Sequence, residues 1–394
     1  MSVEDKTIRR LSQLMAFSFI AEMLICWKLW IPVGREFPMI SAFESLPLHF
    51  GISGDGFLVT VIFISLALII INKFKQIAYI LMMVCFGFLI LEDIARFQPW
   101  VYTQGIILLL LTMNKPSQKK AILTGVLLVI AGTYVWSGIH KLNMNFIRET
   151  FPWMLSSINL DFRVEYGQPT PTINYSFFLF AIAEIGCGIL LLFKKFRSLA
   201  IICSIIMHLS ILLFIGPLGL HWNHVVWPWN ISLILVLVLF LRSNLEFNLL
   251  EAMKQLKINY VIAVLFFVMP FLNLFGYWDN NLSSRMYSGK HSNAAFYFKG
   301  LKDNKMDKHQ ELSSTLDVDL EGNYQGTKSH LTYWSIYDLK APHYPADRYY
   351  YRIGKVLCAK LVDPEPAGIE IMRREIFSGI QHIERCSCEE LTER

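Results

Sequence analysis

Residues 134–143, YVWSGIHKLN, place a lysine and a histidine side by side where a long apolar stretch ends. On a helix, Tyr134, Gly138 and Lys141 share one face. Burial disfavours the charged form of an amine, so a lysine held in an apolar mouth can act as a general base near neutral pH. A lysine at a helix end can also simply anchor the helix at the membrane surface, and spacing alone favours that simpler interpretation. Lys141 and its neighbour His140 are the candidate catalytic residues.

Three ionisable residues, Glu22, Glu184 and His208, lie near the middle of apolar stretches. Such residues are costly in a bilayer and usually face the bundle interior or a water-filled cavity. Glu184 lies in AIAEIGCGILLL, whose small residues let helices approach closely, so we expect it to be packed, paired and part of the catalytic group. His208 joins Tyr134 as a candidate ligand-binding residue, although a structural hydrogen bond to a neighbouring helix explains it equally well.

Polar residues also gather at the ends of the apolar stretches. LEDIARFQPW contains Glu92, Asp93 and Trp100, which are candidate ligand-binding residues. Glu92 and Arg96 are four residues apart, which is also the spacing of an ordinary helical ion pair.

GLHWNHVVWPWN contains His221 and His224 at i, i+3 spacing. Without a third ligand nearby this is a weak metal signal, and we predict no metal site. His221 stays a candidate ligand-binding residue, and the tryptophans of this stretch fit an interfacial aromatic belt.

These residues must be positioned by membrane helices. The chain has 394 residues, of which 54% are hydrophobic and 17% charged, against about 25% charged in an average soluble domain. Hydropathy predicts an all-α polytopic bundle over residues 1–276 and a polar tail over 277–394. The nine predicted spans are 11–32, 57–72, 77–96, 100–113, 121–142, 172–193, 197–216, 225–241 and 258–276.

Basic residues cluster in alternate connections, which predicts a cytoplasmic N-terminus and an exoplasmic tail. The segment before the first span and every second connection after it contain fourteen basic residues. They are Lys6, Arg9, Arg10, Lys73, Lys75, Lys115, Lys119, Lys120, Lys194, Lys195, Arg197, Arg242, Lys254 and Lys257. The lysines and arginines are dispersed among loops, so we expect a lipid bilayer and no nucleic acid as partner.

The tail reads as a small α+β region. NAAFYF and GIEIMRREIF have strand patterns, and residues 328–340 and 345–361 have helical patterns. In an oxidising compartment, Cys358 is expected to form a disulfide with Cys386 or Cys388. The third thiol is then either a bystander or a site of redox exchange.

The stretch YVWSGIHKLN followed by FPWML resembles vitamin K-dependent gamma-carboxylase-like proteins, including the bacterial HTTM group. In that family the lysine matching Lys141 is regarded as the base that deprotonates a reduced quinone. SGIHKL and FLFAIAEIGCGILLL resemble DoxX/MauE-like redox-associated membrane proteins, with a glutamate matching Glu184. One departure is RFQPWVY, which lacks the Asn-His pair that the carboxylases show there, so glutamate carboxylation is not expected.

The resemblance implies a bacterial inner-membrane protein with a periplasmic C-terminus. It would bind a quinone or another lipophilic ligand in an outward-facing pocket, and it would carry out carboxylase-like or redox chemistry if it is an enzyme. The alternative is a non-catalytic accessory protein that holds an exported redox partner at the membrane. A transporter would require inverted repeats or broken helices, and neither is evident.

Overall fold

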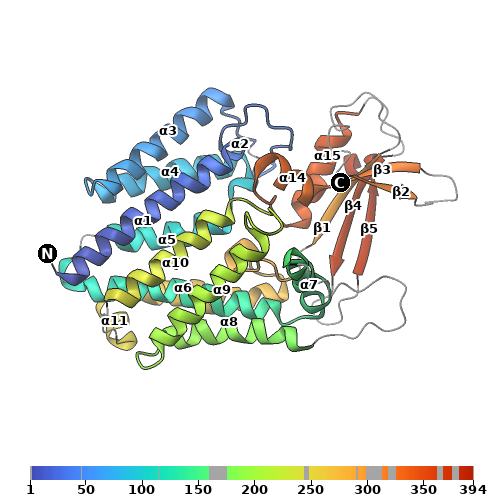
Figure 1. Cartoon of the computed structure of the whole chain (residues 1–394). Coiled ribbons are helices and arrows are strands. Elements are labelled where there is room, and N and C mark those ends of the chain that lie inside the picture. Colours follow the sequence, from blue (N-terminus) through green and yellow to red (C-terminus); the bar gives the residue numbers. More distant parts are fainter. Residues whose placement is uncertain are drawn as a thin grey trace.

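The chain folds into a bundle of long helices and a C-terminal region that contains a β-sheet (Figure 1). The computed structural model describes residues 2–45, 47–113, 115–158, 175–243, 248–289, 292–298, 313–317, 325–361, 367–374 and 381–393. In Figure 1 the N-terminus lies at the end of the bundle that is remote from the sheet.

The bundle contains α1 to α13. The helices are α1 (Val3–Ile25), α2 (Trp27–Trp30), α3 (Gly51–Ile70), α4 (Lys75–Glu92), α5 (Pro99–Thr112), α6 (Lys119–Lys141), α7 (Phe151–Leu155), α8 (Phe178–Leu191), α9 (Arg197–Ile215), α10 (Val226–Ser243), α11 (Leu249–Gln255), α12 (Ile258–Ala263) and α13 (Met269–Leu272). Local signals set several of these boundaries. Ser2 and Asp5 form a capping box at the start of α1, and Pro99 opens α5, where a missing N–H costs nothing.

Six helical stretches among the described residues are long and apolar enough to cross a membrane, which makes this a multi-pass membrane protein. They are Gly51–Ile70, Lys75–Glu92, Pro116–Lys141, Arg197–Ile215, Val226–Ser243 and Ile258–Phe275. The predicted count of nine spans is not confirmed. The apolar helices Pro99–Thr112 and Tyr175–Leu191 are shorter, and α1 carries five charged residues in its first eight positions, Glu4, Asp5, Lys6, Arg9 and Arg10. Residues 172–174 of the predicted sixth span lie outside the described residues.

Helix α6 forms the centre of the bundle, and nearly all of its apolar stretch is buried. Glycines allow α8 to pack directly on its backbone. A Cβ atom at Gly138 of α6 would lie 2.7 Å from the carbonyl oxygen of Ala181, and one at Gly188 of α8 would lie 2.7 Å from that of Ala131. Because real Cβ atoms do not approach so closely, the spacing of α6 and α8 depends on these glycines.

The C-terminal region packs on one end of the bundle. Gln98, just before α5, donates to the carbonyl of Pro342, and Arg352 donates to that of Ser41. Lys28 forms an ion pair with Asp338 at 2.8 Å. Burial alone would raise the pKa of Asp338, but hydrogen bonds from Lys28 and from the backbone of Glu36 and Phe37 hold that pKa below its usual value.

The sheet is antiparallel, with strand order β2-β3-β1-β4-β5. Its strands are β1 (Asn293–Phe298), β2 (Ser313–Asp317), β3 (Gln325–His330), β4 (Ala367–Arg374) and β5 (Gln381–Ser387), and its helices are α14 (Leu331–Leu339), α15 (Asp347–Cys358) and α16 (Cys388–Glu393). The predicted strand NAAFYF coincides with β1. The predicted helix over 328–340 begins only at Leu331, because residues 328–330 pair with β1 as part of β3.

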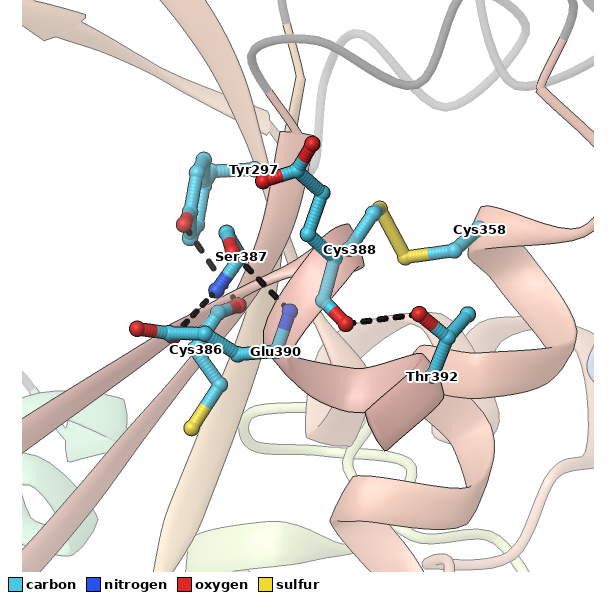
Figure 2. The surroundings of a disulfide bond; sticks show 8 residues. Tyr297, Cys358, Cys386, Ser387, Cys388, Glu390 and Thr392 are labelled. Carbon is cyan, nitrogen blue, oxygen red and sulfur yellow. Dashed lines mark hydrogen bonds between the residues drawn. A yellow bond between two sulfur atoms is a disulfide. The ribbon is translucent and has the colours of Figure 1, made fainter. Parts of the chain in front are cut away.

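A disulfide joins Cys358, at the end of α15, to Cys388, at the start of α16 (Figure 2). This is one of the two pairings that the sequence left open. Cys386 lies in β5 and is buried, and in Figure 2 its sulfur points away from the disulfide. Cys386 and Cys388 are only two residues apart but point in different directions, because Cys386 belongs to strand β5 and Cys388 begins helix α16.

Candidate functional site

Lys141 forms an ion pair with Glu184 across the interface between α6 and α8. The distance from Lys141 Nζ to Glu184 Oε2 is 2.7 Å, and Lys141 Nζ also donates to Ser137 Oγ at 2.6 Å. The two charged side chains are 14% and 9% exposed. Because both side chains are mostly buried, the attraction between the two charges is stronger than it would be in water.

The glycine at position 138 explains how the pair forms. Gly138 lies one turn before Lys141 and packs against the α8 backbone at Ala181 and Ile185, in the same turn of α8 that carries Glu184. The close approach of the two backbones brings the lysine within reach of the glutamate. A larger residue at position 138 would push the helices apart and lengthen the ion pair.

A separate hydrogen-bonded chain runs from Tyr134, on the same helix as Lys141, toward α9 and α10. Tyr134 Oη lies 2.6 Å from His208 Nε2, and His208 Nδ1 lies 2.7 Å from Asn230 Oδ1. Asn230 in turn donates to the carbonyl of Val226. Both ring nitrogens of His208 are therefore engaged, which fixes the ring and gives this candidate residue a structural function as well.

His140 is completely buried and does not belong to the Lys141–Glu184 contact. Its ring packs 5.7 Å from that of Trp136, centre to centre, and its carbonyl accepts from Asn143 Nδ2. Adjacent residues on a helix point about 100° apart, so the side chains of His140 and Lys141 face different neighbours.

Glu92 belongs to a second network, which is centred on Arg96. Arg96 forms ion pairs with Asp55 at 2.8 Å and with Glu92 at 2.7 Å, and its guanidinium also donates to three backbone carbonyls, those of Leu29, Trp30 and Leu89.

Asp93 pairs separately with Arg35 at 2.7 Å. The structure therefore assigns Glu92 and Asp93 to ion pairs that join the end of α4, directly or through Arg96, to α3 and to the segment that follows α2. No contact recorded for the described residues links them to Lys141. The Glu92–Arg96 ion pair, which the sequence left as an alternative, is present, but it does not lie within one helix: Glu92 ends α4, and Arg96 lies in the short 3-10 turn that follows it.

A cavity of about 460 Å³ lies where the C-terminal region meets the bundle. Its wall is rich in aromatic side chains, including Trp100, Trp153, Trp222, Trp229, Tyr287 and Tyr333. Trp100 and Trp229 lie near the starts of α5 and α10, Trp153 lies in α7 and Tyr333 in α14. Trp222 precedes α10 and Tyr287 precedes β1, so residues far apart in the sequence form one wall. Its size falls within the range of about 300–1,000 Å³ that is typical of small-molecule sites.

Of the predicted ligand-binding residues, Trp100 lines this cavity and His221 does not. His221 is exposed, adopts a positive φ of 50° and packs its ring against Trp227. No group of three His, Cys, Asp or Glu residues suited to a metal occurs in the described part of the chain.

Glu22 has a different environment from the other acids. It is fully buried in α1 and accepts hydrogen bonds from Ser18 Oγ at 2.9 Å and Gln104 Nε2 at 2.6 Å. Gln104 was not identified from the sequence, because a single amide in an apolar stretch carries no pattern. Asn230 was missed for the same reason, whereas Asp55 was missed because the predicted span began at residue 57 and α3 begins at Gly51.

The chain matches no protein-family model, no curated protein and no solved structure. The resemblance to carboxylase-like and DoxX-like proteins is therefore a hypothesis that depends on the short motifs alone.

Proposed function

We propose that this membrane protein belongs to the carboxylase-like and DoxX-like superfamily and binds a quinone or a similar lipophilic ring compound in the cavity between its bundle and its C-terminal region. The observation that carries the proposal is the aromatic wall of that cavity, at a volume of about 460 Å³. Flat aromatic side chains pack well against a ring and exclude water from it.

The Lys141–Glu184 pair supplies proton chemistry in this proposal. As an ion pair, the two groups share one proton that resides on the amine. Transfer of that proton to Glu184 leaves a neutral amine and a neutral acid, and the amine can then accept a proton from an acidic hydroxyl. The pair does not line the cavity. Asn143, two residues after Lys141, donates to the carbonyl of Ser288, which is next to the cavity residue Gly289, so a hydrogen bond connects the end of α6 to the cavity wall.

The proposal places the N-terminus in the cytoplasm and the C-terminal region outside the bacterial inner membrane. The basic residues of the alternate connections support this orientation. The Cys358–Cys388 disulfide also supports it, because such bonds persist in oxidising compartments. A reporter that is active only in the cytoplasm, fused after Arg394, should be inactive; an active reporter would contradict the orientation.

The test of ligand binding is the content of the purified protein. After extraction from membranes in mild detergent, organic extraction and mass spectrometry should recover a quinone or related ring lipid in a fixed ratio to protein. The variant Ile336→Trp fills the cavity and should lose this ligand. The matched control Ile231→Trp lies on the exposed face of α10, outside the cavity, and should retain it.

Intact wild-type protein that carries no lipophilic compound and binds none when it is added would contradict the proposal. The accessory-protein alternative would then be the better explanation.

A further inference from the structure

Three basic side chains gather where the end of α14 meets the start of α10. The backbone N–H of Val225, just before α10, donates to the carbonyl of Lys340, which ends α14, at 3.3 Å. His224 precedes Val225, and its ring lies 4.5 Å from that of Trp227, centre to centre. The ring of His221 lies 6.1 Å from the same indole. Two segments far apart in the sequence therefore bring a lysine and two histidines to one place.

This basic cluster, which consists of Lys340, His221 and His224, has no carboxylate to balance it. In the part of the chain that the structure describes, no ion pair is recorded for any of the three. Lys340 Nζ lies 5.3 Å from the centre of the Tyr337 ring, which attracts the amine but supplies no oxygen acceptor. Burial and, after it, the charges of Lys340 and His221 lower the pKa of His224. An anion bound among these groups would relieve their mutual repulsion.

The cluster is open to a ligand. His221 is exposed, and Lys340 and His224 are half-buried. The Nδ1 atom of His224 is enclosed, so a ligand would be bound by Nε2. His221 and Asn223 both adopt a positive φ, of 50° and 48°. Such a backbone costs free energy for residues other than glycine, and it is found where a loop must hold side chains in a fixed position.

The surface beside the cluster is apolar. Because α9 and α10 are both long and apolar enough to cross a membrane, the segment that joins them lies at one surface of the bilayer. Leu218 in this segment is 84% exposed, and Leu213 of α9 and Ile231 of α10 are also exposed. The phosphate groups of phospholipids lie at the surface of the bilayer, and their acyl chains cover the apolar faces of the helices below it.

We propose that Lys340, His221 and His224 bind the phosphate of an anionic phospholipid, whose acyl chains lie on the exposed faces of α9 and α10. A lysine ammonium and an imidazole N–H both donate to phosphate oxygens. None of the three side chains lines the aromatic cavity, so this is a second site, and it does not depend on the proposed function.

The experiment is native mass spectrometry of the full-length protein in detergent, with increasing amounts of dioleoyl-phosphatidylglycerol. The wild type should retain this lipid. Dioleoylglycerol has the acyl chains without the phosphate, and glycerol 3-phosphate has the phosphate without the chains. Each should bind at least about tenfold more weakly than the phospholipid, because each lacks one of the two groups that the site recognises.

Lys340→Gln should weaken binding of phosphatidylglycerol about tenfold, which is the effect of losing one charge-assisted hydrogen bond. His221→Asn keeps a residue that tolerates a positive φ, and it and His224→Gln should each weaken binding about threefold. The matched control is Lys360→Gln, which removes a lysine from an exposed position of the C-terminal region outside the cluster. It should bind the lipid like the wild type.

Equal affinity for glycerol 3-phosphate and the phospholipid would indicate an anion site that does not require a lipid, and equal affinity for dioleoylglycerol would indicate an apolar surface without a phosphate site. Either result would overturn the proposal, as would no binding of phosphatidylglycerol or equal losses in Lys340→Gln and Lys360→Gln. If a variant does not fold, a phosphatidylglycerol analogue with a photoreactive headgroup decides in the wild type. It should label the segment between α9 and α10 or the end of α14, and labelling only elsewhere would refute the site.

Discussion

Two buried ionic networks in the bundle differ in how completely their charges are satisfied. Arg96 is completely buried, pairs with Asp55 and Glu92, and donates further to three carbonyls. Lys141 forms one ion pair, with Glu184, and one hydrogen bond to a side chain, that of Ser137, at short distance, and it remains 14% exposed. From the sequence alone, Glu92 of the first network and Glu184 of the second are predicted to belong to one site.

This difference in hydrogen bonding distinguishes a network that can only stabilise the fold from a pair that can also exchange a proton. A guanidinium is always charged, and five donors directed at fixed acceptors leave it no capacity for another partner. A lysine amine can lose its proton, and Glu184 can take that proton. We therefore propose that the Arg96 network stabilises the fold and that the Lys141–Glu184 pair serves the proposed function, and the following predictions test this proposal.

The largest effect is expected for Arg96→Ala. Removing the cation leaves Asp55 and Glu92 buried without a counter-charge, which costs about 3–5 kcal/mol of unfolding free energy. Unfolding of the purified protein in detergent by increasing denaturant measures it. Arg96→Lys keeps the charge but not the planar fork and should lose less. A variant that unfolds like the wild type would show that the network does not hold the fold.

The next largest effect is expected for the pH dependence of stability that His343 causes. Burial lowers the pKa of His343 in the C-terminal region to about 4, from an ordinary value of 6.5. Between these values the unfolded chain binds a proton that the folded chain does not, so stability should fall as the pH drops from about 6.5 to 4. The loss should approach about 3 kcal/mol.

Melting temperatures measured across this pH range test the dependence. His343→Gln should flatten the curve, and the exposed control His382→Gln should not. An equally steep curve for His343→Gln would assign the dependence to other groups.

Lys141→Arg should change stability by less than about 1 kcal/mol, because arginine can also pair with Glu184. It should nevertheless abolish function, since arginine cannot serve as a base. Complementation of a gene deletion is a suitable measurement, and Lys28→Arg, at the ion pair with Asp338, is the matched control that should be silent. Full function in Lys141→Arg would return this lysine to the role of an anchor.

The smallest effect is expected for Glu22→Gln. Within the described residues no ion pair is recorded for Glu22, and its bonds come from the neutral side chains of Ser18 and Gln104. A neutral amide of the same shape should therefore cost less than about 1 kcal/mol, unlike Arg96→Ala. A loss as large as that of Arg96→Ala would mean that Glu22 carries a charge that the fold requires.

The sequence by itself determined which segments are helical and where costly polar residues lie. Long apolar runs are typical of helices in a bilayer, and the structure has a helix at the position of each predicted span. In the tail, strands β1 and β4 lie where the strand patterns predicted them. It also identified Lys141 and Glu184, because ionisable residues in apolar stretches stand out. Cys358 was correctly expected to be near Cys388, although the pattern could not choose between Cys388 and Cys386.

Only the tertiary structure decided which of these residues meet. Lys141 and Glu184 are 43 residues apart, and Arg96 and Asp55 are 41 apart. Periodicity describes the faces of one helix and says nothing about which helix lies opposite. The glycine at position 138 permits a close contact without specifying the partner helix, and the cavity exists only where three separate segments of the bundle and the C-terminal region converge. Burial is a local property that sequence records, whereas pairing depends on the packing of the whole chain.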